Sequence, residues 1–105
     1  MTGSRLESFR AMVARQPDNA LARFGLATEA LKAGLHQEAV DQFRAYLSMH
    51  QDEGNAYLRL AEALERLGQT AEAREALRAG IEAAGRFGHP GMAAEMEERL
   101  DSLGA

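Results

Sequence analysis

The sequence matches itself when it is shifted by 34 residues, and this internal repeat constrains the fold more than any other feature. The recurring elements are a Leu-Ala pair, a single glycine and a Glu-Ala pair. They lie at Leu26-Ala27 and Leu60-Ala61, at Gly34 and Gly68, and at Glu38-Ala39 and Glu72-Ala73. A fixed period of this length is typical of proteins built from stacked supersecondary units. The period predicts two full units, residues 20–53 and 54–87.

Each unit reads as two helices separated by a glycine. Apolar residues recur every three or four positions on both sides of the glycine, as they do on one face of a helix. In the first unit these residues are Leu21, Phe24, Ala27 and Leu31, then Ala39, Val40, Phe43 and Leu47. In the second unit they are Tyr57, Leu60, Ala61 and Leu64, then Ala73, Ala76, Leu77 and Ile81. Gly34 and Gly68 are expected to end the first helix of each unit, because glycine tolerates a positive φ. Glu38 and Glu72 fall in the first turn of the second helix, where the helix dipole favours an anion.

The flanking segments fit the same register. Pro17 lies 34 residues before Gln51, so residues 4–16 are expected to form a lone second helix. Pro90 is expected to open a final helix over residues 90–103, and both prolines should lie near the first position of a helix. The apolar stripe of the final helix is Met92, Met96, Leu100 and Leu103. The whole chain, residues 1–105, is therefore interpreted as one all-α domain of about six helices, an antiparallel stack of helical hairpins.

The composition narrows the class of protein. The chain has 105 residues, of which 46% are hydrophobic and 27% charged, so it resembles an ordered globular domain. Its formal net charge of −4 argues against a nucleic-acid partner, which needs a basic face. The absence of cysteine excludes disulfides and thiolate metal sites. No apolar run is long enough for a membrane span, and charged side chains interrupt the first residues where a signal peptide would be apolar. We therefore expect a cytoplasmic protein that contacts neither nucleic acid nor membrane.

At these positions the sequence resembles the tetratricopeptide repeat family, whose motif has 34 residues. The motif's Leu-Gly slot holds the two Leu-Ala pairs, and its Ala-x3-Phe slot holds Ala39 with Phe43 and Ala73 with Leu77. The tryptophan slot holds Arg23 and Tyr57, and the closing proline slot holds Pro17, Gln51 and Gly85. Arg23, Gln51 and Gly85 depart from the motif. The resemblance covers nearly the whole chain and implies a right-handed superhelix of helical hairpins.

No catalytic, cofactor-binding or metal-binding constellation is evident in the sequence. His36, His50 and His89 are too far apart to supply the paired ligands of a metal site, and we expect them to be solvated. Glutamates are spread over helix surfaces, where Glu62 with Arg66 and Glu95 with Arg99 are expected to form i,i+4 pairs. There is no nucleophile motif and no phosphate-binding glycine loop. The chain is therefore interpreted as a non-enzyme without a cofactor.

The first helix of each unit carries the candidate binding residues. The resemblance implies that these helices line the concave surface of the stack. In this chain each of them carries a second row of residues, here called a stripe, beside the residues needed for packing. The stripes are Leu21, Phe24, Thr28 and Leu31 in the first unit, and Asn55, Leu58, Glu62 and Glu65 in the second. Part of the family grips a C-terminal carboxylate with Lys and Asn, but the matching slots hold Phe24, Thr28 and Arg59, so that clamp is not supported.

These features predict a scaffold or adaptor that holds a peptide or a partner helix in a groove. One alternative is self-association, with the second stripe as a homodimer interface. A remote alternative is an enzyme or a nucleotide-binding protein, because fold alone does not exclude one. Two details stay open: Phe24 lies either in an open groove or inside the protomer, and Met92 and Met96 form either core or a soft binding surface.

Overall fold

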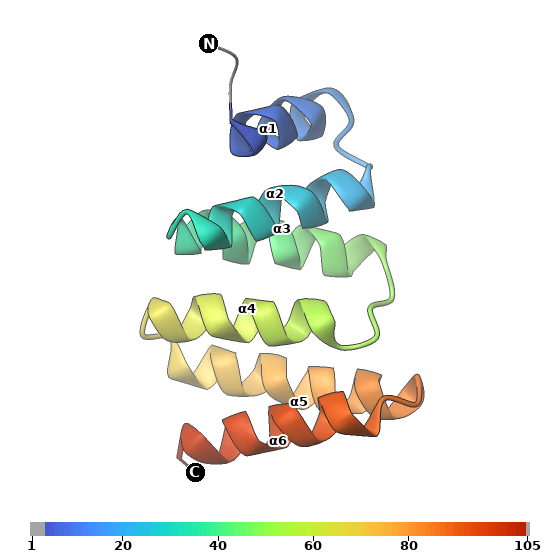
Figure 1. Cartoon of the computed structure of the whole chain (residues 1–105), viewed down its shortest axis with the longest axis vertical. Helices are drawn as coiled ribbons and strands as arrows, with labels where there is room; N and C mark the ends of the chain where they lie inside the picture. Colours follow the sequence, from blue (N-terminus) through green and yellow to red (C-terminus); the bar gives the residue numbers. More distant parts are fainter. Residues whose placement is uncertain (1–3, 105) are drawn as a thin grey trace. The chain divides into compact units, whose positions relative to one another are not determined.

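The computed structural model describes residues 4–104, and these residues form six α-helices (Figure 1). The helices are α1 (Arg5–Arg15), α2 (Ala20–Lys32), α3 (His36–Met49), α4 (Asn55–Arg66), α5 (Thr70–Arg86) and α6 (Pro90–Ser102). No described residue belongs to a strand. The predicted all-α fold of six helices packed as sequential hairpins is confirmed.

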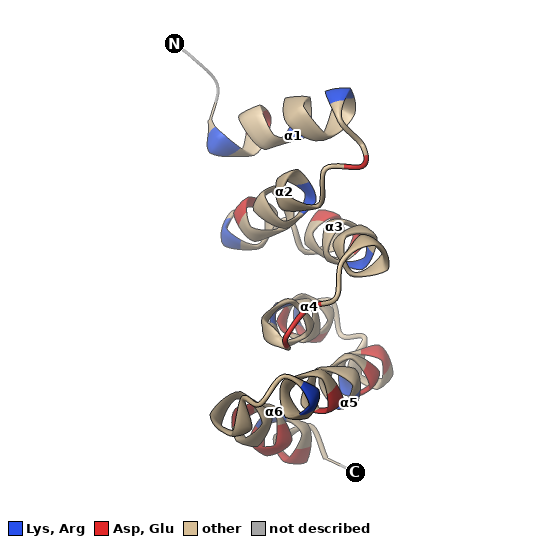
Figure 2. Cartoon of the chain, turned by 90° about the vertical axis from the view of Figure 1, so that its right-hand side faces the viewer, with Lys and Arg blue, Asp and Glu red and all other residues tan. Residues whose placement is uncertain are grey.

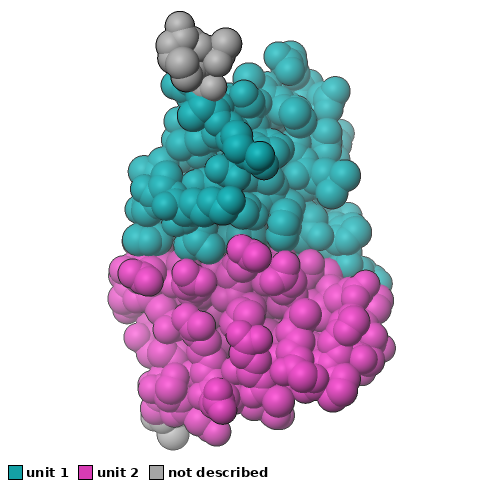
Figure 3. Space-filling view, in the orientation of Figure 1, with its two compact units in different colours: residues 1–51 teal, residues 52–105 magenta. Residues whose placement is uncertain are grey.

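The chain divides into two compact units (Figure 3). The N-terminal unit, residues 1–51, contains α1 to α3, and the C-terminal unit, residues 52–105, contains α4 to α6. Within the N-terminal unit α2 packs against both α1 and α3, and within the C-terminal unit α5 packs against both α4 and α6. Each unit therefore has one central helix covered on two sides. The single domain over residues 1–105 and the repeat bounds at 20–53 and 54–87 remain predictions.

Glycines end the first helix of each repeat, as the sequence predicts. Gly34 has φ of 78° and Gly68 has φ of 76°, both in the left-handed region. The residue after each glycine donates its backbone N–H to a carbonyl near the helix end: Leu35 to Ala30 at 2.9 Å and Gln69 to Leu64 at 2.9 Å. These bonds satisfy carbonyls that the helix itself leaves without a donor.

The helix starts are capped by side chains more often than by proline. Ser4 and Glu7 form a reciprocal capping box at α1, and the Asn19 side chain accepts the backbone N–H of Ala22 at α2. Pro90 is the first residue of α6, as predicted. The prediction for Pro17 is wrong, because this residue lies in the turn before Asn19 rather than at a helical position. Asparagine is the stronger cap, and it places the start of α2 three residues later.

Small residues close the contact between the two helices of each hairpin. Ala39 and Ala73 are completely buried, as are Phe43 and Leu77 four positions after them. The alanine lets the two helices approach closely, and the large apolar residue on the same helix face fills the space that remains. The residues in the Ala-x3-Phe slot of the sequence motif therefore pack the two helices of the hairpin together in both units.

Candidate functional site

Helix α2 has one closed face and one accessible face. The closed face packs inside the N-terminal unit and is at most 2% exposed, and it consists of Ala22, Leu26, Ala27 and Ala30. The accessible face is the predicted stripe. There Leu21 is 80% exposed, and Phe24, Thr28 and Leu31 are half-buried.

Phe24 is partly held by its own unit. Its ring meets the ring of Phe43 edge-on, with centroids 5.9 Å apart, and lies tilted against Tyr46 at 5.1 Å. Aromatic pairs in these arrangements are attractive beyond the area that they bury. Phe24 therefore contributes one edge to the α2–α3 hairpin and leaves part of its surface accessible.

Hydrogen bonds fix the start of α2, where Leu21 lies. The Arg23 guanidinium donates to the Pro17 carbonyl at 3.1 Å and to the Gln42 side chain at 3.0 Å. The Asn19 side chain accepts from Ala22 N–H at 3.0 Å and donates to the Gln16 side chain at 2.8 Å. Arg23 stands where the family motif has tryptophan, and it ties the turn to α3. The most exposed leucine of the chain therefore projects from a well-anchored helix end.

Helix α4 repeats the two-faced arrangement with a more polar stripe. Its closed face consists of Ala56, Leu60, Ala61, Ala63 and Leu64, all at most 5% exposed. On the predicted stripe Asn55 is exposed, and Leu58, Glu62 and Glu65 are half-buried. The Asp52 carboxylate caps this helix by accepting the backbone N–H groups of Gly54 and Ala56, each at 2.8 Å.

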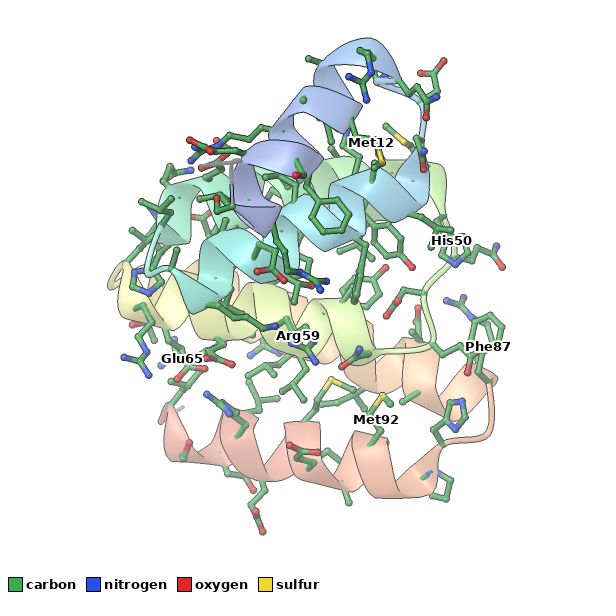
Figure 4. The ribbon with its side chains drawn as sticks, turned by 45° about the horizontal axis from the view of Figure 1, so that its top comes forward. Met12, His50, Arg59, Glu65, Phe87 and Met92 are labelled. Carbon is green, nitrogen blue, oxygen red and sulfur yellow. The ribbon has the colours of Figure 1, made fainter. Side chains whose placement is uncertain are left out.

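A hollow of about 410 Å³ lies between α4 and α6 within the C-terminal unit, and we call it the α4–α6 pocket. It is lined by Glu65, Glu95, Glu98, Arg99 and Ser102. Figure 4 shows Glu65 on the side of α4 that faces α6, and Met92 on the side of α6 that faces α4. The structure thus brings one predicted binding residue, Glu65, together with four residues of α6 that the sequence analysis did not assign to a site.

The ion pairs differ from the predicted ones. Arg99 Nε donates to Glu65 Oε2 at 3.1 Å, across from α6 to α4. Within residues 4–104 neither Glu62 with Arg66 nor Glu95 with Arg99 comes within ion-pair distance, so both predictions are wrong. Glu65 and Arg99 are 34 residues apart, which is one repeat length. A search for opposite charges one period apart would have found this pair, whereas a search within one helix could not.

Arg10 and Glu38 form the ion pair with the clearest electrostatic effect. Arg10 donates from Nε at 2.9 Å and from Nη2 at 2.6 Å to the two carboxylate oxygens of Glu38. These hydrogen bonds lower the pKa of Glu38 and raise the pKa of Arg10. The pair joins α1 to the first turn of α3, so Glu38 does more than complement a helix dipole.

The histidines were expected to be solvated, and none of them is buried, but two of the three also contact a neighbouring side chain. His89 Nε2 contacts Glu53 Oε1, and the ring of His50 lies tilted against Tyr46 with centroids 5.1 Å apart. Within residues 4–104 no group of three or more histidine or carboxylate side chains is placed to hold a metal ion. None of the described helices has the length and apolar character needed to cross a membrane.

Met96 is core, whereas Met92 is only half-buried. Met96 is completely buried, and its sulfur lies 2.5 Å from the point that a Cβ on Gly80 of α5 would occupy. The Met92 sulfur lies 2.7 Å from the corresponding point on Gly54, which has φ of 130°. The terminal helix therefore packs against glycines in its own unit through two flexible side chains.

The comparisons with known proteins agree with this architecture. The sequence model described as tetratricopeptide repeat matches residues 6–52 and 24–87. Protein BPP2914 from Bordetella parapertussis, known from a solution structure, is 28% identical with a TM-score of 0.81, over 97% of this chain and 89% of that one. The crystal structure of MamA is 17% identical with a TM-score of 0.70, over 94% of this chain and 66% of that one. No curated protein sequence matches the chain.

Proposed function

Because the chain belongs to the tetratricopeptide repeat family, whose members are generally protein–protein interaction modules, we propose that it binds a peptide or a helix of a partner protein. Each unit offers its own binding stripe on its first helix: Leu21, Phe24, Thr28 and Leu31 on α2, and Asn55, Leu58, Glu62 and Glu65 on α4. The chain acts as a scaffold or adaptor and not as an enzyme.

One observation supports this proposal most: α2 and α4 each bury one row of side chains and leave the adjacent row accessible to solvent. The closed stripes are the most buried faces of α2 and α4, and on the second stripe of α2 the Phe24 ring also packs against Phe43 and Tyr46. Leu21 is nevertheless 80% exposed, and Phe24, Leu31 and Leu58 keep part of their surface accessible. Apolar anchors on a rigid helix are the usual way in which a groove holds a partner segment.

Replacing Leu21 by serine tests the proposal most cleanly. Because this side chain is mostly in solvent already, the free energy of unfolding should change by about 0.5 kcal/mol or less. Capture of partner proteins by the immobilised chain from a lysate of the source cells should fall severalfold, since apolar anchors often dominate binding energy. Leu35→Ser is the matched control, because Leu35 is also exposed, at 40%, but belongs to the α2–α3 turn and not to the stripe.

The alternatives are separate outcomes of the same experiment. If the stripe were a homodimer interface, the sedimentation coefficient of the pure protein would rise with its concentration, and Leu21→Ser would reduce that rise. If Leu21→Ser and Leu35→Ser captured the same proteins in the same amounts as the unaltered chain, the α2 stripe would not be the binding surface.

A further inference from the structure

The loop before α4 meets the first turn of α6 through two side chains of the C-terminal unit. His89, the N-cap residue of α6, contacts the Glu53 carboxylate through Nε2. Further along the same turn, the Met92 sulfur lies 2.7 Å from the point that a Cβ on Gly54 would occupy. The red segment just before α4 in Figure 2 is this loop, which contains Asp52 and Glu53. We call these two contacts the α6 junction, because they join the start of α6 to the start of α4.

The methionine contact of this junction is apolar. Gly54 is buried, and its backbone N–H already donates to the Asp52 carboxylate at 2.8 Å. The methyl groups of Met96 and Ala84 lie 3.2 and 3.4 Å from the same point beside Gly54. A thioether packs well in such surroundings, because it is apolar and polarisable. A polar group in its place would find the Gly54 N–H already engaged, and burial of an unpaired polar group is costly.

Part of the Met92 side chain is nevertheless accessible to solvent. Met92 is half-buried, whereas Met96, the other methionine of α6, is completely buried. An oxidant dissolved in water therefore reaches Met92 before Met96. Met12 and Met49 are also accessible, but they belong to the N-terminal unit. Within the described part of the C-terminal unit, Met92 is thus the methionine that is open to oxidation.

We propose that Met92 is a modification site, at which a hydroperoxide oxidises the thioether to a sulfoxide and so breaks the α6 junction. The sulfur attacks the terminal oxygen of the hydroperoxide with a lone pair. An S–O bond forms and the O–O bond breaks. The remaining oxygen takes up the proton of the attacked oxygen and leaves as an alcohol, or as water when the oxidant is hydrogen peroxide. The sulfur loses two electrons and the peroxide gains two.

The oxidised side chain no longer suits its place beside Gly54. Oxidation turns a flexible apolar side chain into a polar one, and the Gly54 N–H is not free to donate to the new oxygen. The sulfoxide therefore turns toward solvent, and the first turn of α6 is left with the contact between His89 and Glu53. These two side chains are 41% and 57% exposed, and exposed pairs of this kind contribute little to stability.

The rest of α6 stays in place. Met96 remains packed against Gly80 of α5, and Arg74 still donates to the carbonyls of Leu103 and Gly104 at the far end of the helix. Oxidation should therefore free the first turn of α6 without unfolding the unit, as in other local openings of a folded domain. A reductase can return the sulfoxide to the thioether, so the change is reversible. None of these residues belongs to the binding stripes of α2 and α4, so the modification is independent of the proposed function.

The test treats the full chain with hydrogen peroxide and combines peptide mass spectrometry with amide hydrogen exchange. Met92 should gain an oxygen about tenfold faster than Met96, because Met96 is completely buried. Exchange should then rise about tenfold or more over residues 93–95, which include Ala93, whose N–H donates to the His89 carbonyl at 3.1 Å. Residues 97–102 should keep their protection.

Two variants separate the modification from other effects of peroxide. Met92→Leu has a similar volume and no sulfur, so it should fold normally and show no rise in exchange after treatment. Met92→Gln places a polar side chain beside Gly54 and should reproduce the rise without peroxide. Met49→Leu is the matched control, because it removes a methionine that is 41% exposed in the N-terminal unit, and it should respond like the unaltered chain.

Several results would overturn the proposal. A rise in exchange that persisted in Met92→Leu would place its cause at another residue. Complete oxidation of Met92 with unchanged exchange over residues 93–95 would show that the junction does not depend on the thioether. Oxidation of Met96 at the same rate as Met92 would mean that α6 already opens in the reduced protein. Loss of protection over the whole C-terminal unit would show global unfolding instead of a local opening.

Discussion

The two terminal helices cover their units by different means. Helix α1 has no completely buried residue, and its Phe9 ring occupies the space beside Gly25 of α2. Helix α6 buries Met96 completely against Gly80 of α5. A glycine on the central helix makes room for the covering side chain in both cases, but only α6 uses that room to exclude solvent.

The polar contacts follow the same division. Helix α1 is tied to its unit by two arginine–glutamate pairs, Arg5 with Glu29 and Arg10 with Glu38. Helix α6 is tied by Arg99 to Glu65 and also by Arg74 of α5, which donates to the carbonyls of Leu103 and Gly104, each at 3.1 Å. Exposed ion pairs contribute little to stability, whereas apolar burial contributes much. We therefore expect α6 to be the more firmly held of the two ends.

The largest expected effect comes from Met96→Ala. Removal of a completely buried methionine leaves a cavity and should lower the free energy of unfolding by about 2–5 kcal/mol. Phe9→Ala removes a larger but half-buried side chain and should cost roughly half as much. Urea unfolding followed by circular dichroism measures both, and equal losses would contradict the difference between the ends.

Substituting the two glycines beside the terminal helices, Gly80 and Gly25, should change stability less and should distinguish the two ends more clearly. A Cβ at position 80 would lie 2.5 Å from the Met96 sulfur and 2.8 Å from the Tyr57 Cβ, so it is confined from two sides. Overpacking costs about 1–3 kcal/mol and alanine returns about 1 kcal/mol of helix propensity, so Gly80→Ala should destabilise by up to about 2 kcal/mol.

The three atoms nearest to a Cβ at position 25 would all belong to the Phe9 ring, the first of them 2.3 Å away, and α1 has no buried residue that holds this ring in place. Gly25→Ala should therefore leave the melting temperature nearly unchanged, because the higher helix propensity of alanine offsets the cost of displacing α1. A cost as large as that of Gly80→Ala would mean that α1 is as rigidly seated as α6.

The smallest expected effect is the pH dependence due to Glu38. Its pKa is lowered by hydrogen bonds from Arg10, so its contribution to stability is complete above the ordinary glutamate value of about 4.3 and is lost as the pH falls through the lowered folded value. Glu38→Gln should flatten the acid side of the stability profile below that pH. The exposed Glu97→Gln is the control and should leave the profile unchanged, whereas identical profiles for all three proteins would show that the pair adds nothing.

The sequence predicts those parts of the fold that depend on local rules or on the repeat. Gly34 and Gly68 end helices because few other residues adopt a positive φ, and Ala39 and Ala73 are buried because the period places them at helix contacts. Pro17 was misplaced because two helix-start signals compete within three residues, and Asn19 is the stronger one.

The candidate site was only partly predictable. The stripe on α2 follows from helical spacing, but the half-burial of Phe24 depends on Tyr46, which the periodicity did not single out. The α4–α6 pocket depends on how α6 is rotated about its axis. Met92 and Met96 fix that rotation by entering space beside Gly54 and Gly80, and the role of those glycines as space for a neighbour is invisible in one sequence.

The turns at Gly34 and Gly68 have a consequence for chemical synthesis. Each glycine has a positive φ, and an L-configured Cβ at either position would meet no atom within 4 Å beyond the adjacent residues. A D-alanine residue prefers that backbone conformation, so it should adopt both turns without the backbone strain that an L-alanine would suffer there. Because it also restricts the unfolded chain, each replacement should stabilise the fold by about 0.5–1 kcal/mol. The same two positions are therefore attachment points for a mirror-image residue that carries a dye or a cross-linker.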